Sequence, residues 1–199
     1  MNNKGYIIIW DWRFFVFVGI LLLIFYGYNY SDEQGYISEG SSLYSLGKIF
    51  DLQPPSQDLI EDEILVSTNN ERTSRGLNLL NFDRDLSLIA REHSEDMAAR
   101  DFYDHTNPDG DGPTERAQKK GISIYNGDWI GIAENIAVVY VSNDADCSTN
   151  DEITLGECLV SKWMRSPGHR ENILDVHYDS IGIGVFCDTS ECYATQTFR

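Results

Sequence analysis

The sequence predicts one α+β domain in which helices come first and a pair of strands closes the chain. Two stretches before Arg100 carry apolar residues at helical spacing, and a third helical run passes through Leu159 and Trp163. Residues 180 to 199 alternate instead with the period of two that is typical of strands. Helices that precede strands favour the α+β class. With 199 residues, 42% of them hydrophobic, the chain is long enough for one well-packed domain plus appendages.

Residues 1 to 30 are predicted to form a cytoplasmic stub and a transmembrane signal anchor. Phe14 to Tyr30 is an almost unbroken apolar and aromatic run, and its length of roughly 25 Å approaches the ~30 Å hydrocarbon core of a bilayer. A cleaved secretory signal is the alternative, but the run is long for one and no small-residue cleavage site follows it. Lys4 and Arg13 precede the run and acidic residues follow it, which orients the N-terminus inside. We therefore expect a single-pass membrane protein with an extracellular C-terminal domain.

A flexible stalk is expected over residues 31 to 60, which are rich in Ser, Gly and acidic residues and show no sustained period. A short amphipathic helix between Leu43 and Phe50 is the alternative there. The globular domain then spans residues 61 to 199.

Two helices open this domain. The first is predicted from about Asp62 to Arg75, where Gly76 ends it, and the second from an N-cap at Asp83 to about Arg100. On the second helix, His93 falls on an apolar stripe that also contains Leu86, Ile89, Ala90 and Met97. We interpret His93 as a hydrogen-bonded packing residue rather than a ligand.

His105 is the first candidate site residue, because it lies in a turn rather than on a helical face. Residues 106 to 112 are mainly turn-forming, and a turn can direct an imidazole into a cleft. The alternative is a histidine that caps the preceding helix. A short scaffolding helix is predicted next, from an N-cap at Thr114 through Arg116 to Gly121.

Glu134 is the second candidate, because it is a carboxylate in an otherwise apolar run from Trp129 to Val141. Burying an unpaired carboxylate is costly, so either this segment is an edge or Glu134 faces a polar cleft. The adjacent Asn135 favours the cleft. There, a carboxylate could orient an imidazole through its ring N–H or ligate a cation directly.

His169 is the third candidate. The helical run through Leu159 and Trp163 is expected to end where Pro167 removes a backbone donor and Gly168 relaxes the backbone. His169 is thereby placed at a helix exit.

All four cysteines, Cys147, Cys158, Cys187 and Cys192, follow the hydrophobic segment, in the part expected outside the membrane, where disulfides persist. Three pairings are possible, and loop lengths favour Cys147 with Cys158 and Cys187 with Cys192. The second pair would join the two closing strands. A zinc site made of all four cysteines is the competing interpretation, but the sequence contains no C-x2-C pair.

Five ordered motifs resemble the CAP superfamily, which comprises the cysteine-rich secretory, antigen 5 and pathogenesis-related proteins and is also called the SCP domain. They are F-x-x-H-x-x-P-D-G from Phe102, A-E-N-I-A from Ala133, W-x-x-S-P-G-H-R-E-N-I-L from Trp163, I-G-I-G-V from Ile181, and a closing aromatic strand. The resemblance covers roughly Glu61 to Arg199. It is closest to the prokaryotic branch, which carries S-P-G-H-R.

This resemblance implies the three-layer α-β-α sandwich of the CAP domain, with His105, Glu134 and His169 at its central cavity. His105 and His169 are the candidate ligands of zinc or another divalent cation. The sequence departs from the pattern in one place, since many animal members have a second cavity Glu where this chain has Ser166. Any mechanism that needs two carboxylates is therefore in doubt.

Three hypotheses of function are consistent with these residues. The first, which we favour, is a membrane-tethered module that binds a divalent cation or a small or lipid ligand without turnover, since no Ser or Cys stands in a nucleophile motif. The second is a metal-dependent hydrolase or peptidase with His105 and His169 as ligands and Glu134 activating water. The third is a surface or adhesion module with an idle cavity. A net charge of −17 repels phosphate backbones, so no nucleic-acid partner is expected.

Overall fold

The computed structural model describes residues 55–127, 129–140, 147 and 151–199. The predicted anchor in residues 1 to 30 and the stalk up to residue 54 lie outside the described residues. Among the residues that are described, no helix is long and apolar enough to cross a membrane. Gln53–Arg199 form one compact unit.

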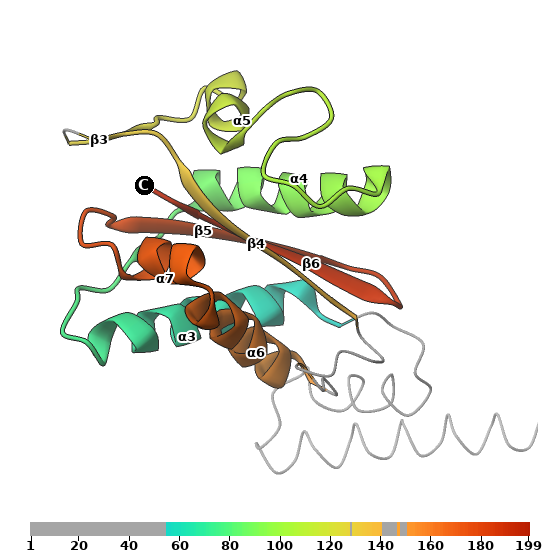
Figure 1. Ribbon diagram of the computed structural model, residues 1–199, viewed down its shortest axis with the longest axis horizontal. Helices are drawn as coiled ribbons and strands as arrows, with labels where there is room; N and C mark the ends of the chain where they lie inside the picture. The colour runs from blue at the N-terminus through green and yellow to red at the C-terminus, as the bar shows by residue number, and fades with distance from the viewer. Residues whose placement is uncertain (1–54, 128, 141–146, 148–150) are drawn as a thin grey trace, which may run out of the picture. The chain divides into compact units, whose positions relative to one another are not determined.

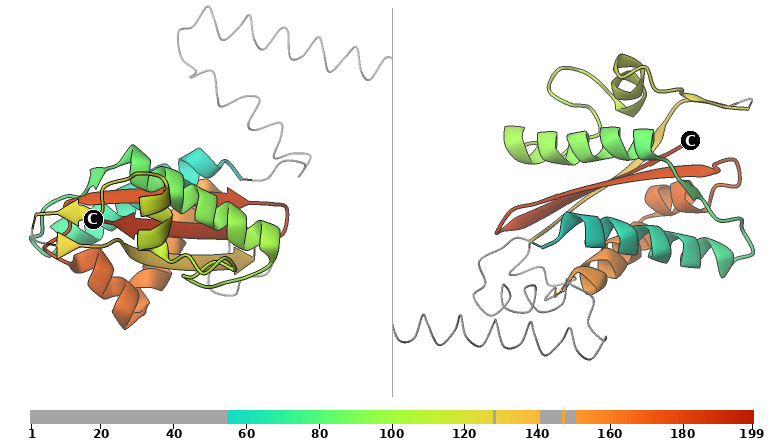
Figure 2. Two further views of the ribbon diagram at one scale, coloured as in Figure 1. Left: turned by 90° about the horizontal axis from the view of Figure 1, so that it is seen from above. Right: turned by 180° about the vertical axis from the view of Figure 1, so that it is seen from behind.

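The domain is a sandwich of three layers, with a four-stranded sheet between two layers of helices (Figure 1, Figure 2). One helical layer contains α4 (Arg84–Arg100) and α5 (Pro113–Lys119), and the other contains α3 (Gln57–Thr73), α6 (Glu152–Arg165) and α7 (Pro167–Leu174). The strand order is β1 (Asn81–Phe82), β5 (Ser180–Cys187), β6 (Glu191–Phe198) and β4 (Ala133–Tyr140). A separate antiparallel pair consists of β2 (Tyr125–Asn126) and β3 (Trp129–Ile130). The predicted α+β class and α-β-α layering are confirmed.

Helix α3 begins at Gln57, five residues before its predicted start at Asp62. Residues 57–60, which the sequence placed in the stalk, are therefore helical. The reason is that Ile60 and Ile64, one turn apart on the same face, are both fully buried in the core. Burial of apolar side chains stabilises a helical turn that the local sequence alone favours only weakly.

Helix α4 agrees with its predicted bounds, and the Asp83 side chain caps it by accepting from the backbone N–H groups of Asp85 and Leu86. The helix packs directly on β5 because two positions of that strand lack side chains. A Cβ atom on Gly184 would lie 1.9 Å from the backbone nitrogen of Arg91, and one on Gly182 would lie 2.2 Å from the backbone carbonyl carbon of Leu86. Close backbone approach therefore explains the two glycines of this strand.

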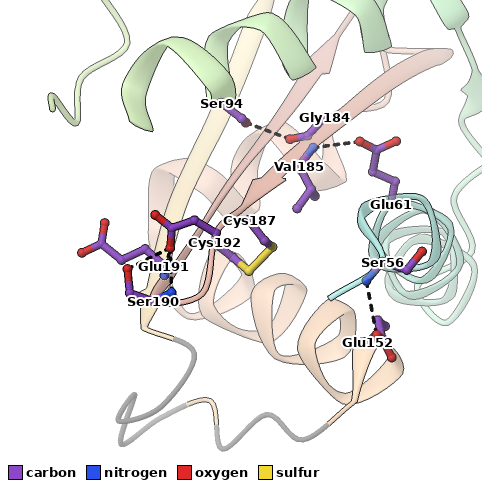
Figure 3. The surroundings of a disulfide bond; sticks show 11 residues. Ser56, Glu61, Ser94, Glu152, Gly184, Val185, Cys187, Ser190, Glu191 and Cys192 are labelled. Atoms are coloured by element: carbon purple, nitrogen blue, oxygen red, sulfur yellow. Dashed lines mark hydrogen bonds between the residues drawn. A yellow bond between two sulfur atoms is a disulfide. The ribbon is translucent and has the colours of Figure 1, made fainter. Parts of the chain in front are cut away.

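Strands β5 and β6 form the predicted antiparallel hairpin. The Cys187–Cys192 disulfide joins them directly, with the two Cα atoms 4.1 Å apart (Figure 3). The Cys147–Cys158 disulfide is also present, with a Cα separation of 5.7 Å. Both predicted pairings are confirmed, and the described residues contain no free cysteine.

Candidate functional site

The candidate residues gather at the outer edge of β4, where the loop after α4 and helix α7 meet this strand. β4 pairs with β6 on one side, and side chains bind its backbone on the other. The Ile136 carbonyl accepts from the Tyr103 hydroxyl and the Trp163 indole, each at 3.0 Å. The Glu134 carbonyl accepts from the Asn172 amide at 3.2 Å. These contacts hold the loop and both helices α6 and α7 against one strand edge.

His105 is presented by the predicted turn. Helix α4 ends at Arg100, and its C-cap residue Asp101 has a φ of 53°, in the left-handed region. Farther along, the Asn107 side chain accepts from the backbone N–H groups of Asp109 and Asp111, which closes the turn. The His105 side chain is 47% exposed. It therefore faces solvent with part of its ring while the rest contacts the strand edge.

Glu134 lies beneath His105 and is almost fully buried, with 1% of its side chain exposed. Its Oε1 is 2.9 Å from His105 Nδ1, and its Oε2 pairs with the Arg116 guanidinium. A carboxylate in an ion pair accepts hydrogen bonds, so Nδ1 of His105 carries the hydrogen and Nε2 is left as the outward nitrogen. From the sequence, two alternatives were open for Glu134: it lies on an edge strand, or it faces a polar cleft. The structure combines the two, since β4 is an edge strand and the carboxylate is enclosed by polar partners.

Arg116 is a site residue that was not predicted from the sequence. Helix α5 begins at Pro113 with Gly112 as its N-cap, and not at the predicted cap Thr114, whose hydroxyl accepts instead from the Ile132 N–H. Arg116 lies in the last turn of this seven-residue helix, and its guanidinium contacts Glu134 of β4. The sequence contained one weak signal for this residue, because a carboxylate in an apolar strand requires a cation from elsewhere.

His93 is fully buried, as predicted, yet it belongs to the same polar cluster. Its Nε2 donates to the Asp104 carbonyl at 3.1 Å and lies 3.7 Å from Glu134 Oε1. Its Nδ1, like Nε of Arg116, has no hydrogen-bond partner among the described residues. Burial lowers the pKa of His93 below its ordinary value of 6.5. His93 is thus a neutral ring packed beneath the site.

His169 is the third residue of helix α7 and does not lie at a helix exit. Pro167 ends α6, but it also begins α7, because the first helical position needs no backbone donor. Ser166 serves as the cap between the two helices. The Asn135 amide donates to the His169 carbonyl at 3.1 Å, which ties α7 to β4.

The pKa values of His105 and His169 are shifted in opposite directions. The hydrogen bond to Glu134 raises the pKa of His105 above its ordinary 6.5. Burial, followed by repulsion from the charge on His105, lowers the pKa of His169. A lowered pKa favours the neutral form of the His169 imidazole, which is the form that binds metals.

The described residues around this site supply few possible metal ligands. In the described part of the chain, no group of three or more His, Cys, Asp or Glu side chains could hold a metal. Both oxygens of Glu134 already have partners, so the structure favours its role as the orienting carboxylate over that of a direct ligand. Glu171, the nearest other carboxylate in the sequence, lines a groove with Arg170, Leu174 and Asp175.

Comparison with known proteins gives consistent matches over the described domain. Residues 65–198 match the family described as CAP, the cysteine-rich secretory protein family. In Bacillus subtilis strain 168, the uncharacterized protein YkwD is 34% identical over 131 residues, and the uncharacterized membrane protein YlbC is 30% identical over 138 residues. The matches cover 66% and 69% of this chain, but 44% and 34% of those proteins, so the chain spans less than half the length of either relative.

Solved structures show the same fold. An extracellular SCP-domain protein from Bacillus anthracis superposes with a TM-score of 0.58 at 25% identity, covering 71% of this chain and 40% of that one. An outer surface protein from Borrelia burgdorferi superposes with a TM-score of 0.56 at 18% identity, covering 74% of this chain and 97% of that one.

Proposed function

Because this chain belongs to the cysteine-rich secretory protein (CAP) family, we propose that it is a membrane-anchored, extracytoplasmic CAP domain whose His105 and His169 bind a divalent cation or a small or lipid ligand without turnover. The observation that carries the proposal is the Glu134–His105 hydrogen bond of 2.9 Å. It fixes the ring so that Nε2 points away from its carboxylate partner, an arrangement shared by many histidines that bind metals. His169 supplies the second imidazole.

Zinc is the probe that tests the site, since neutral imidazoles suit it well. Protein purified without chelator is expected to take up zinc, and uptake should be lost in the double variant His105→Ala/His169→Ala. His177→Ala is the matched control, because that ring is exposed and pairs with Asp175. Equal zinc content in the double variant and the wild type would refute the metal site.

Location outside the cell is supported by the two disulfides, which persist in oxidising compartments. One relative is described as a membrane protein and one structural neighbour as extracellular. We propose that residues 1 to 30 anchor the chain and residues 31 to 60 connect the anchor to the domain. Recovery of soluble mature protein that begins near Ser31 would contradict the anchor.

Hydrolysis is the second candidate function, and the same hydrogen bond supports it. A histidine held by a carboxylate through Nδ1 can act as a general base through Nε2. That role falls to His105 and not to Glu134, whose oxygens face His105 and Arg116. Turnover of a peptide library that disappears in His105→Ala would favour this function over simple binding.

A further inference from the structure

We propose that Arg116 is the positioning residue of this site, holding Glu134 and the His105 loop so that the His105 ring presents Nε2 to the ligand. The inference rests on the proposed function for the nature of the ligand, but the geometry behind it is independent of that ligand. Arg116 binds both halves of the His105–Glu134 pair. It contacts the carboxylate that accepts from the ring and the main chain that carries the ring.

Three acceptors converge on this one guanidinium. Nη2 pairs with Glu134 Oε2, while Nη1 donates to the carbonyl of His105 at 2.7 Å and to that of Asp111 at 3.0 Å. His105 and Asp111 are the two ends of the turn that carries the candidate ring. One side chain therefore ties both ends of an exposed turn to the edge strand. A planar guanidinium with donors in a fixed fork suits this task, and an ammonium group does not.

The pairing also decides how Glu134 is oriented. With Oε2 held by Arg116, Oε1 is left to face His105 Nδ1. The Arg116 side chain is only 10% exposed and that of Glu134 only 1%, so water competes little for this contact. Without the guanidinium, the carboxylate would be free to rotate and the ring would lose its fixed acceptor.

Other cations hold the same turn, but at exposed positions. Arg100 reaches Asp109, whose side chain is 64% exposed, and Lys119, itself 64% exposed, reaches Asp111. Exposed ion pairs restrain a loop weakly. Both cations pair with carboxylates of the turn itself rather than with Glu134, so neither sets the direction of the His105 ring.

The test measures which ring nitrogen of His105 carries the hydrogen. Long-range proton–nitrogen NMR spectra are recorded on the full-length chain in detergent micelles, labelled at histidine, at about pH 9, where imidazoles are neutral. Zinc chloride titration of the same variants at about pH 7, where the metal ion stays in solution, gives the affinity. The variants are Arg116→Met, Arg116→Lys, which keeps the charge but loses the fork, and the control Arg100→Met, which removes a cation from the same turn.

We expect Nδ1–H in the wild type and in Arg100→Met, and a mixture of both tautomers in the two Arg116 variants. Zinc affinity should fall by about tenfold in the Arg116 variants, as for other outer partners of metal-binding histidines. If Arg116→Met folds, a retained Nδ1–H tautomer in that variant overturns the proposal. If it does not fold, the Arg116→Lys variant decides in the same way. A wild type that binds no zinc refutes the proposed metal site, while the tautomer comparison still tests Arg116.

Discussion

The Glu134–Arg116 ion pair makes the strongest quantitative prediction, because both side chains are buried. Their exposed fractions are 1% and 10%, which places the pair among buried ion pairs rather than surface ones. Removing one partner of such a pair leaves an uncompensated charge and costs about 3–5 kcal/mol of unfolding free energy. We expect this loss for Glu134→Gln and for Arg116→Met separately. The double variant should lose far less than the sum, since neither charge is then left alone.

The wild type, the two single variants and the double variant form a double-mutant cycle. Their free energies of unfolding are measured by urea unfolding of residues 53–199, monitored through the fluorescence of the buried Trp163. The expected coupling energy is about 3 kcal/mol, at the upper end of the range for residues in direct contact. A matched cycle on the exposed pair Lys120–Glu92, whose side chains are 44% and 42% exposed, should give less than about 1 kcal/mol. Additive losses for Glu134 and Arg116 would refute our reasoning that these two charges depend on each other.

The remaining predictions concern pH and packing. Burial lowers the pKa of His93 below 6.5, so below this pH the unfolded chain binds a proton that the folded chain does not. The free energy of unfolding should therefore fall as the pH drops below 6.5. His93→Phe should flatten this part of the pH–stability curve. His105 has the opposite effect, because its pKa is raised in the folded state. It contributes stability below pH 6.5, and this contribution is lost as the pH rises through the pKa of His105 in the folded chain. His105→Ala should remove the contribution. Gly184→Ala should lose at least about 3 kcal/mol, because its Cβ would meet the backbone of α4. At Gly168 an added Cβ would meet no atom within 4 Å, so Gly168→Ala should be neutral or stabilising by up to about 1 kcal/mol. Equal melting points for the two glycine variants would contradict the packing argument.

The site was predictable in part, because its histidines and its carboxylate stand out locally. His105 precedes a run of turn residues, and Glu134 interrupts an apolar strand, so each was recognisable without its neighbours. Their contact was not recognisable in the same way. It joins residues 29 positions apart, and the distance depends on how the loop after α4 folds back on the sheet. The role of Arg116 was hidden for the same reason, since it acts across 18 positions.

Local signals in the sequence were sufficient to predict the α+β class, the Asp83-capped helix α4, the β5–β6 hairpin and both disulfide pairs. All of these depend on periodicity, capping and short loops, which act over a few residues. The start of α3 depends instead on packing between layers, because Ile60 is helical through its burial against the core. The same holds for Pro167, which starts a helix as well as ending one, and for Arg116, which neutralises Glu134. Each of these features is stabilised by contacts in the folded domain, and the free energy of such contacts is set by residues distant in the chain.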